Sequence, residues 1–472
     1  MATHAASARK SGGCIDALMP LASECRPAIQ LEKSTRQADN RISTQPTFMG
    51  GESSLRISRA HDPQFAIALL MAMVFILSLG YSAWMPLLPL YLHGYIAKSS
   101  PSTMAWHVGM LGGVYTFALF AFSSWWGRRS DRWGRIRVLQ LGFAGYLLGI
   151  LLSALATNLM TVYAARILSG IGAAAVMPAA QAYIADVSDI TRRNRRFVFL
   201  GSASFIGFLA GPMLGSWLAG PVMGMTAGSM LWMVNLPLLV IPVLGLPVLL
   251  AAHLWVKPSP TPHPAEVLAA TESADRARFA RASMLLAAVA AFAVGTFEIG
   301  FNLFGGLTLK AGTTAVAILF VTCSVSMLAA QTTLVWESVR RHVDHHWLAA
   351  AFAMSALAMA ITPWTPDVVS LGLLVTLVAA SIGLIGPVIS YELLDHGGAL
   401  RGAMLGNLAA ASNLGQALGS FAAGWMFSFR PGSPFWFAAL ALMGGSLAAY
   451  FYWGEARRNV MIAGIRTSVD LR

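Results

Sequence analysis

Twelve apolar runs, separated by short polar breaks, cover the chain from residue 64 to residue 453. A bilayer core about 30 Å thick requires roughly twenty apolar residues in a helix, and the runs are close to that length. We therefore predict an all-α integral membrane protein with twelve transmembrane helices. The predicted helices are residues 64–92, 106–126, 138–156, 159–184, 197–219, 229–255, 283–305, 313–336, 348–363, 367–391, 403–427 and 434–453.

The longest polar break, residues 257–282, divides the predicted helices into six plus six. It opens with KPSPTPHP and continues with charged and small residues, which is the composition of a linker. We expect an N-terminal half at residues 64–256 and a C-terminal half at residues 283–453. The polar stretches 1–63 and 454–472 are predicted to be cytosolic tails, the first of them disordered.

Two short matches indicate that the halves are related. GPMLGSWLAG at Gly211–Gly220 matches GQALGSFAAG at Gly415–Gly424, each in the fifth helix of its half. A proline also precedes an aspartate by eight residues in the fourth helix of each half, at Pro178–Asp186 and at Pro387–Asp395. Such duplication predicts two pseudo-symmetric halves with a substrate site between them.

Composition excludes several classes of protein. The chain is 56% hydrophobic and 11% charged, whereas a soluble domain is roughly 25% charged. The net charge of +12 lies in short loops rather than on a basic face with stacking aromatics, so we expect no nucleic-acid partner. The three cysteines lack metal-ligand or disulfide spacing, and no catalytic constellation shares one membrane depth. We expect no enzymatic activity, no cofactor and no metal.

Basic residues alternate strongly between successive loops, with sixteen Lys and Arg in one set and three in the other. Cytoplasmic loops carry the positive excess, so the richer set is predicted to be cytoplasmic, together with both termini. The richer set is Arg128, Arg129, Arg132, Arg135, Arg137, Arg192, Arg193, Arg195, Arg196, Lys257, Arg276, Arg278, Arg281, Arg340, Arg341 and Arg401, and the poorer set is Lys98, Lys310 and Arg430.

The loop between helices 2 and 3 reads WGRRSDRWGR and contains Gly127, Asp131, Arg132, Gly134 and Arg135. Glycine permits a tight turn, and an acid among arginines accepts charge-assisted hydrogen bonds that join helix ends. A generic basic loop would explain the arginines but not this spacing. The pattern resembles the loop signature of the major facilitator superfamily, and the resemblance implies a gating latch on the cytoplasmic side.

The corresponding loop of the second half, WESVRRHVDH, keeps basic residues but lacks the glycines. We expect its latch to be degenerate. His342, His345 and His346 lie near Asp344 in this loop. Clustered loop histidines without a second ligand set are more often exposed to solvent than bound to a metal.

Helix 5 contains Gly207, Gly211, Pro212, Gly215 and Ser216. Glycines on one face allow close helix packing, and an intramembrane proline frees a backbone carbonyl. Packing alone is the alternative role for these residues. Their spacing resembles the helix 5 signature of the family's drug and proton antiporters, except that Ser216 replaces a glycine. The resemblance favours export over uptake.

Helix 4 carries Arg166 inside an apolar run, where a charge normally faces a cavity or a partner. Resemblance to the family implies a role in proton coupling. The alternative is snorkelling, because roughly 10 Å separates Arg166 from the outer end of its helix.

Helix 7 carries Glu298 about 22 Å from the start of its predicted helix, near the expected level of Arg166. A proton-coupled carrier requires a carboxyl that is neutral in one state and charged in another, and we propose Glu298 for this role, with Asp131 and Asp186 as lesser candidates. A structural carboxyl bonded to a neighbour such as Asn302 is the alternative. Many related antiporters have an acid in helix 1, but Gly80–Leu92 contains none.

Several side chains in the apolar runs are candidates for lining a substrate cavity or simply for packing, namely Trp84, Tyr115, Trp232, Asn302 and Phe304. The helix 1 segment GYSAWMPLLPLYL also resembles bacterial twelve-helix multidrug exporters. The sequence thus predicts a monomeric secondary transporter of the bacterial inner membrane that exports small amphipathic compounds in exchange for protons by alternating access. An exporter of one metabolite, such as a siderophore, and a proton-coupled uptake symporter are the alternatives.

The charge asymmetry predicts which side of the membrane each loop faces. A cysteine at Ser99 should react with an impermeant thiol reagent added outside the cell, whereas a cysteine at Ser338 should react only after the membrane is opened. The measurement is labelling of the two variants in intact and permeabilised cells. The reverse pattern would overturn the orientation.

Overall fold

The computed structural model describes residues 63–96, 100–188, 190–220, 227–256, 274–334, 344–396 and 401–460, all within the compact unit His61–Arg472. Across these ranges the regular elements are all helical, as predicted. Residues 1–62 and 461–472, and the part of the predicted linker up to residue 273, lie outside the described part of the chain.

The first half contains α2 (Pro63–Trp84), η1 (Met85–Leu87), α3 (Leu88–Ile96), α4 (Pro101–Trp133), α5 (Arg135–Ala154), α6 (Leu159–Asp186), α7 (Ile190–Ala219) and α8 (Ala227–Trp255). The second half contains α9 (Ala274–Leu303), η2 (Phe304–Thr308), α10 (Thr313–Thr333), α12 (His345–Ile361), η3 (Thr362–Trp364), α13 (Val368–His396), α14 (Arg401–Phe427), α15 (Ser433–Ala448) and η5 (Ala449–Trp453).

Membrane spans number twelve in the described ranges when α2, η1 and α3 are taken as one interrupted helix. Eleven are long and apolar enough to cross a bilayer by length and composition. The one predicted span that is not among these eleven is α14. Its hydropathy is lowered by polar residues such as Asn407, Asn413 and Gln416. Because α14 packs against both α9 and α4, it has protein neighbours on two sides rather than lipid alone.

Several helices extend beyond their predicted ends, and two of them continue into segments predicted to be the linker and the C-terminal tail. Helix α9 begins at Ala274, so residues 274–282, which we had assigned to the linker, are its first turns. The last helix continues through η5 to Val460, and residues 454–460 are therefore helical rather than part of a tail. In both cases the extra turns are amphipathic or charged, and apolar length alone does not reveal them.

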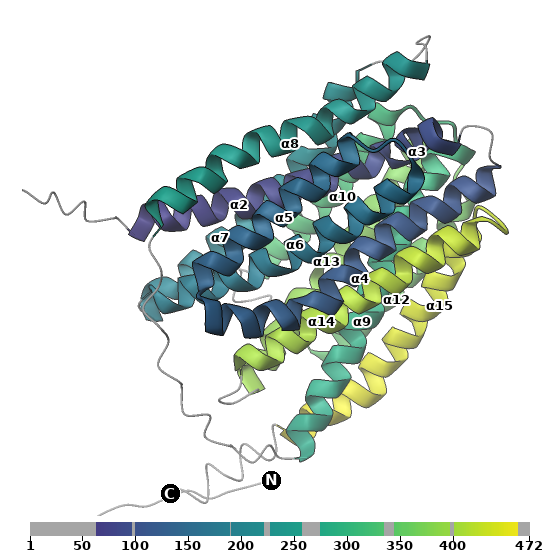
Figure 1. Cartoon of the computed structure of the whole chain (residues 1–472). Coiled ribbons are helices and arrows are strands. Elements are labelled where there is room, and N and C mark those ends of the chain that lie inside the picture. The colour runs from purple at the N-terminus through teal and green to yellow at the C-terminus, as the bar shows by residue number, and fades with distance from the viewer. Residues whose placement is uncertain are drawn as a thin grey trace, which may run out of the picture. The chain divides into compact units, whose positions relative to one another are not determined.

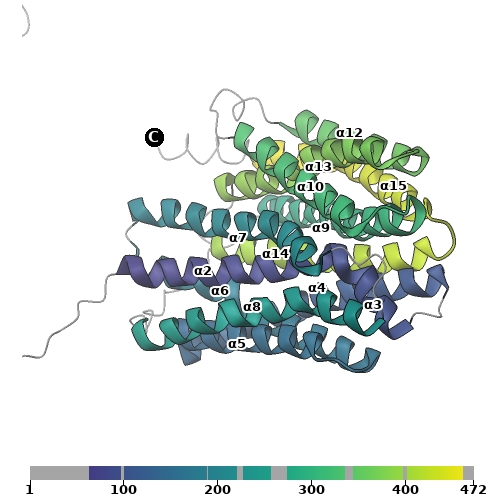
Figure 2. The same cartoon turned by 90° about the horizontal axis from the view of Figure 1, so that it is seen from above.

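In Figure 2 most helices of the second half, such as α10, α12, α13 and α15, lie on one side of the first half, while α14 lies next to first-half helices. We call the end of the bundle where α4 ends and α5 begins the basic end, and the opposite end, where α3 ends and α4 begins, the far end. Helices α4 and α14 run side by side between the halves (Figure 1). Near the far end a Cβ at Gly109 would meet the backbone of Gly424, so these two helices are in close contact there.

The internal duplication appears as two equivalent helix contacts. Gly211 and Gly215 of α7 lie against the backbone of α2, and Gly415 and Gly419 of α14 lie against the backbone of α9. A Cβ at any of these four positions would press on main-chain atoms that cannot rotate away. The matching segments therefore have the same structural role in each half: they bring two helix backbones into close contact.

This packing predicts the effect of a single methyl group. Replacing Gly211 with Ala should lower the stability of the folded protein by about 1–3 kcal/mol, because the new Cβ must displace the backbone of α2. Thermal unfolding of the purified protein in detergent measures the effect. Gly201→Ala is the matched control, since Gly201 lies on the same helix with nothing within 4 Å of its ideal Cβ. Equal melting temperatures for both variants would contradict the role of the glycine face.

Candidate functional site

Arg166 lies deep in the first half, on α6, with a side chain that is 0% exposed. Its guanidinium carbon lies 3.6 Å from the centre of the Trp84 ring and 5.2 Å from that of Tyr115. None of its three side-chain nitrogens has a hydrogen-bond partner among the described residues. A snorkelling arginine keeps its charged group in water, so Arg166 instead presents a buried positive charge to the interior.

The aromatic neighbours of Arg166 come from two other helices. Trp84 ends α2 immediately before the Pro86 turn, and Tyr115 lies in the middle of α4. Both side chains are buried, and ring faces attract a cation more strongly where water is absent. The predicted cavity residues Trp84 and Tyr115 thus contact the guanidinium of Arg166 directly. The indole Nε1 of Trp84 has no hydrogen-bond partner among the described residues.

Glu298 is the buried acid of α9, with 6% of the residue exposed. Its Oε2 accepts hydrogen bonds from the Tyr81 hydroxyl at 3.3 Å and from Gln416 Nε2 at 3.4 Å. Its Oε1 has no partner among the described residues. The sequence missed both donors and suggested Asn302 instead. Asn302 in fact donates from Nδ2 to the Met85 carbonyl at 2.6 Å.

The two buried charges lie in different halves and are not paired. The rings of Tyr115 and Tyr81 connect them, since Arg166 lies over the Tyr115 ring and the neighbouring Tyr81 donates to Glu298. No salt bridge within 4.0 Å joins these two described residues. A rearrangement that brought them together would favour the charged carboxylate, and their separation favours the neutral acid. The charge of Glu298 thus depends on its distance from Arg166.

Aromatic side chains pack near Arg166 and Glu298. The Tyr81 ring lies 5.0 Å from the Tyr115 ring and 6.0 Å from that of Phe208, measured between centroids. Phe304, another predicted cavity residue, packs edge-on against Phe435 at 5.7 Å within the second half. The side chain of Trp232 lies outside the described part of the structure.

The predicted latch residues gather at the basic end. Arg135 forms ion pairs with Asp131, one turn earlier, and with Asp186 at the end of α6, where the N–O distance is 3.3 Å. Gly134 has a φ of +92° between α4 and α5, a conformation that favours glycine. Gly127 makes no turn, since it lies inside α4 with nothing within 4 Å of its ideal Cβ.

Asp186 was also a candidate for proton binding. The structure places it at the basic end, with its carboxylate facing Arg135. Arg193 and Arg196 of α7 donate to the Ala185 and Val187 carbonyls nearby, which gives partners to acceptors at the end of α6. This cluster joins three helix ends and is separate from Glu298.

The glycines and Ser216 of the predicted fifth helix, which is α7, make two different contacts. Gly207 continues the close glycine contact with α2, and Pro212 lies inside α7 between Gly211 and Gly215. Ser216, which replaces the glycine of the family pattern, is 3.3 Å from Thr314 of α10 between hydroxyl oxygens. The departure therefore adds a hydrogen bond from the first half to the second.

The second half has a charged pair that the sequence did not reveal. Arg457 donates through Nε and Nη2 to the two oxygens of Glu392, each at 2.7 Å. This bidentate pair joins α13 to the helical turns after η5. Arg457 lay in the predicted tail, so only a longer last helix would have suggested the contact.

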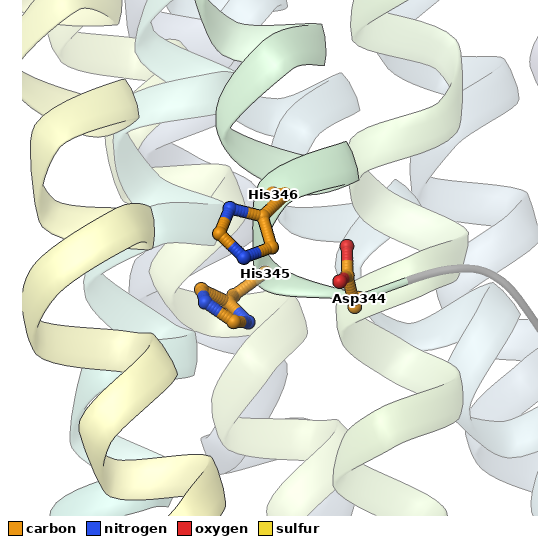
Figure 3. A group of neighbouring side chains, drawn as sticks. All are labelled: Asp344, His345 and His346. Atoms are coloured by element: carbon orange, nitrogen blue, oxygen red, sulfur yellow. The ribbon is translucent and has the colours of Figure 1, made fainter.

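Figure 3 shows Asp344, His345 and His346 at the start of α12, with ligand atoms within 4.8 Å of one another. His342 lies outside the described residues. Asp344 Oδ1 accepts from the Trp347 amide at 3.0 Å and caps the helix, while the two imidazole rings are tilted by 37° with their centroids 3.9 Å apart. Helix capping accounts for the position of Asp344.

Known proteins resemble most of this chain. A family model described as Major Facilitator Superfamily matches residues 70–402. Multidrug resistance protein 2 of Bacillus subtilis (strain 168) is 22% identical over 400 residues, which are 83% of this chain and 96% of that protein. Tetracycline resistance protein, class B, of Escherichia coli is 36% identical over 140 residues, 30% of this chain and 34% of that protein.

The fold has a clear counterpart among solved structures. A D-xylose-proton symporter superposes with a TM-score of 0.66 at 16% identity, covering 83% of this chain and 98% of that one. At such identity the likeness concerns the fold alone. The family model covers more than half of the sequence, and the helical architecture agrees with it. The chain therefore belongs to the Major Facilitator Superfamily, and it is a membrane transporter of small molecules.

Proposed function

We propose that the protein exports small amphipathic compounds in exchange for protons. One observation carries the proposal: a buried carboxyl, Glu298, lies near the unpaired cation Arg166 of the other half, in a chain similar to a multidrug resistance protein. The tetracycline resistance protein, class B, adds a second relative whose name describes resistance. Both resemblances favour efflux over uptake.

Alternating access requires that the halves, residues 64–256 and 283–453, part at one end while they meet at the other. The described hydrogen bonds between halves are Tyr81 to Glu298, Asn302 to the Met85 carbonyl and Ser216 to Thr314. They lie from mid-helix to the far end, as does the Gly109–Gly424 contact. With the basic end in the cytoplasm, this arrangement corresponds to a carrier closed toward the outside.

Glu298 is the proposed proton carrier. Away from water a lone carboxyl favours its neutral form, and an arginine within about 4 to 6 Å favours the charged form. Rocking of the halves moves α6 relative to α9, and so moves Arg166 relative to Glu298. Proton uptake and release then follow from the conformational cycle, with no covalent chemistry.

The ion pairs of Arg135 with Asp131 and Asp186 are the proposed cytoplasmic latch in its open position, because all three residues lie in the first half and the carrier is closed toward the outside. They join the end of α4 to the end of α6 beside the α4–α5 turn. Asp131 is 60% exposed, so solvent screens its bond to Arg135, and such a bond is weak enough to re-form in each cycle. The family resemblance of this loop supports a gating role.

Neutralising the carrier tests the proposal directly. Glu298→Gln should still exchange cargo downhill but lose pH-driven accumulation, because an amide mimics a permanently neutral acid. Uptake of ethidium, an amphipathic cation, into everted membrane vesicles with and without a pH gradient measures this. Glu455→Gln, which changes an exposed carboxyl, is the control. Accumulation by Glu298→Gln with the pH dependence of wild type would make Glu298 structural.

Neutralising the latch should act differently. Asp131→Asn removes the acceptor charge that faces Arg135, so transport should fall about tenfold while the protein still reaches the membrane. Vesicle transport normalised to the amount of protein gives the value. Asp131→Glu keeps the charge and is expected to restore part of the rate. Undiminished transport by Asp131→Asn would remove the residue from the gating mechanism.

A further inference from the structure

Of the three described hydrogen bonds between the halves, one ends on an ionisable group. Tyr81 of α2 donates to Glu298 of α9, whereas the other two bonds join Asn302 to a carbonyl and Ser216 to Thr314. The strength of the Tyr81 bond therefore depends on the charge of Glu298, and the strengths of the other two do not. This makes one contact between the halves sensitive to the proton that the transporter carries.

We propose that Tyr81 is a positioning residue that locks the empty, unprotonated transporter with its far end closed. The proposal rests on the proposed role of Glu298 as proton carrier. It adds a function that the carrier role does not require, which is to prevent the halves from rocking when neither proton nor cargo is bound.

The chemistry follows from the two oxygens of Glu298. Oε2 is held by Tyr81 from the first half and by Gln416 from the second, while Oε1 has no partner among the described residues. A charged carboxylate accepts a stronger hydrogen bond than a neutral acid does. A proton on Oε1, or a donor group of the cargo at the same oxygen, reduces the charge that holds the Tyr81 hydroxyl.

A bond of this kind meets a requirement of antiport. An antiporter must cross the membrane with either ligand bound but not when empty, because an empty crossing lets one ligand move without the other. Either ligand at Oε1 loosens the Tyr81 bond, and the empty charged carboxylate keeps it. A symporter instead needs its empty form to cross freely, so the same bond would hinder it.

Other titratable groups face Glu298 from neighbouring helices. They are Tyr81 of α2, Arg166 of α6 and Cys323 of α10, with Tyr115 of α4 beside Tyr81. A phenol, a guanidinium and a thiol ordinarily ionise above neutral pH. These three groups therefore keep one charge state between about pH 5.5 and 7.5. Because a carboxyl buried away from water favours its neutral form, Glu298 is the group of this cluster whose charge can change in that range.

The structure offers a clean substitution and a matched control. In Tyr81→Phe the ring keeps its contacts with Tyr115 and Phe208 and loses only the hydroxyl. Tyr91 is also a buried tyrosine of the first half, and its hydroxyl donates to the Ser153 carbonyl at 2.5 Å without crossing to the second half. Tyr91→Phe thus removes a hydroxyl of the same kind but leaves the bond between halves intact.

Hydrogen–deuterium exchange of the purified, cargo-free protein tests the lock. In wild type, peptides covering residues 85–96 and 313–320 at the far end should exchange about tenfold faster at pH 5.5 than at pH 7.5, after correction for intrinsic rates. Tyr81→Phe should exchange fast at both pH values, and Tyr91→Phe should behave as wild type. Retention of the wild-type pH response by Tyr81→Phe would refute the lock.

A third variant separates this inference from the proposed function. If Glu298→Gln loses the pH response while Tyr81→Phe keeps it, Glu298 is still the proton site and only the role of Tyr81 fails. If Glu298→Gln keeps the response, the proton binds elsewhere, and the carrier role and the lock fail together. Loss of the response in both variants, with Tyr91→Phe unchanged, supports both.

Discussion

Hydrocarbon provides no partner for a charge, and this constraint decides what the interior of the bundle must contain. Arg166 and Glu298 are both buried, and neither forms a salt bridge with another described residue. Trp84 and Tyr115 offer ring faces to the cation, while Tyr81 and Gln416 offer hydrogen-bond donors to the acid. Because these groups come from five helices, the helices must pack closely enough for the contacts to exist.

Small residues make that closeness possible. Without a hydrophobic driving force between helices in lipid, association depends on backbone contact and on a few hydrogen bonds. Within each half the glycine faces of α7 and α14 bring two backbones together, and between halves Gly109 meets Gly424. Contacts within the halves involve many helix pairs, while those between the halves are mainly α4 with α14 and α7 with α10, and the described hydrogen bonds between halves lie toward one end. Such a distribution lets the halves move as bodies without unfolding.

Sequence patterns predicted the features that depend on local chemistry. Apolar length indicated the spans, and residue spacing indicated the glycine faces and the grouping of Asp131 with Arg135. The ion pair of Arg135 with Asp186 was not predicted, because Asp186 was considered only for proton binding. Tyr81 and Gln416 were missed because a single polar residue in an apolar run has no pattern until the helix opposite it is known. Asn302 was assigned the wrong partner for the same reason, since one helical turn separates it from Glu298 but its side chain reaches Met85.

The basic end shows how the two halves have diverged. In the first half Asp131 is 60% exposed, and solvent screens its bond to Arg135, so the pair contributes little stability and can break readily. In the second half Glu392 is 5% exposed and binds Arg457 through both oxygens. Breaking that pair would leave a buried charge, which is strongly unfavourable. The first pair therefore suits a contact that opens in each cycle, and the second suits a permanent link between α13 and the last helix.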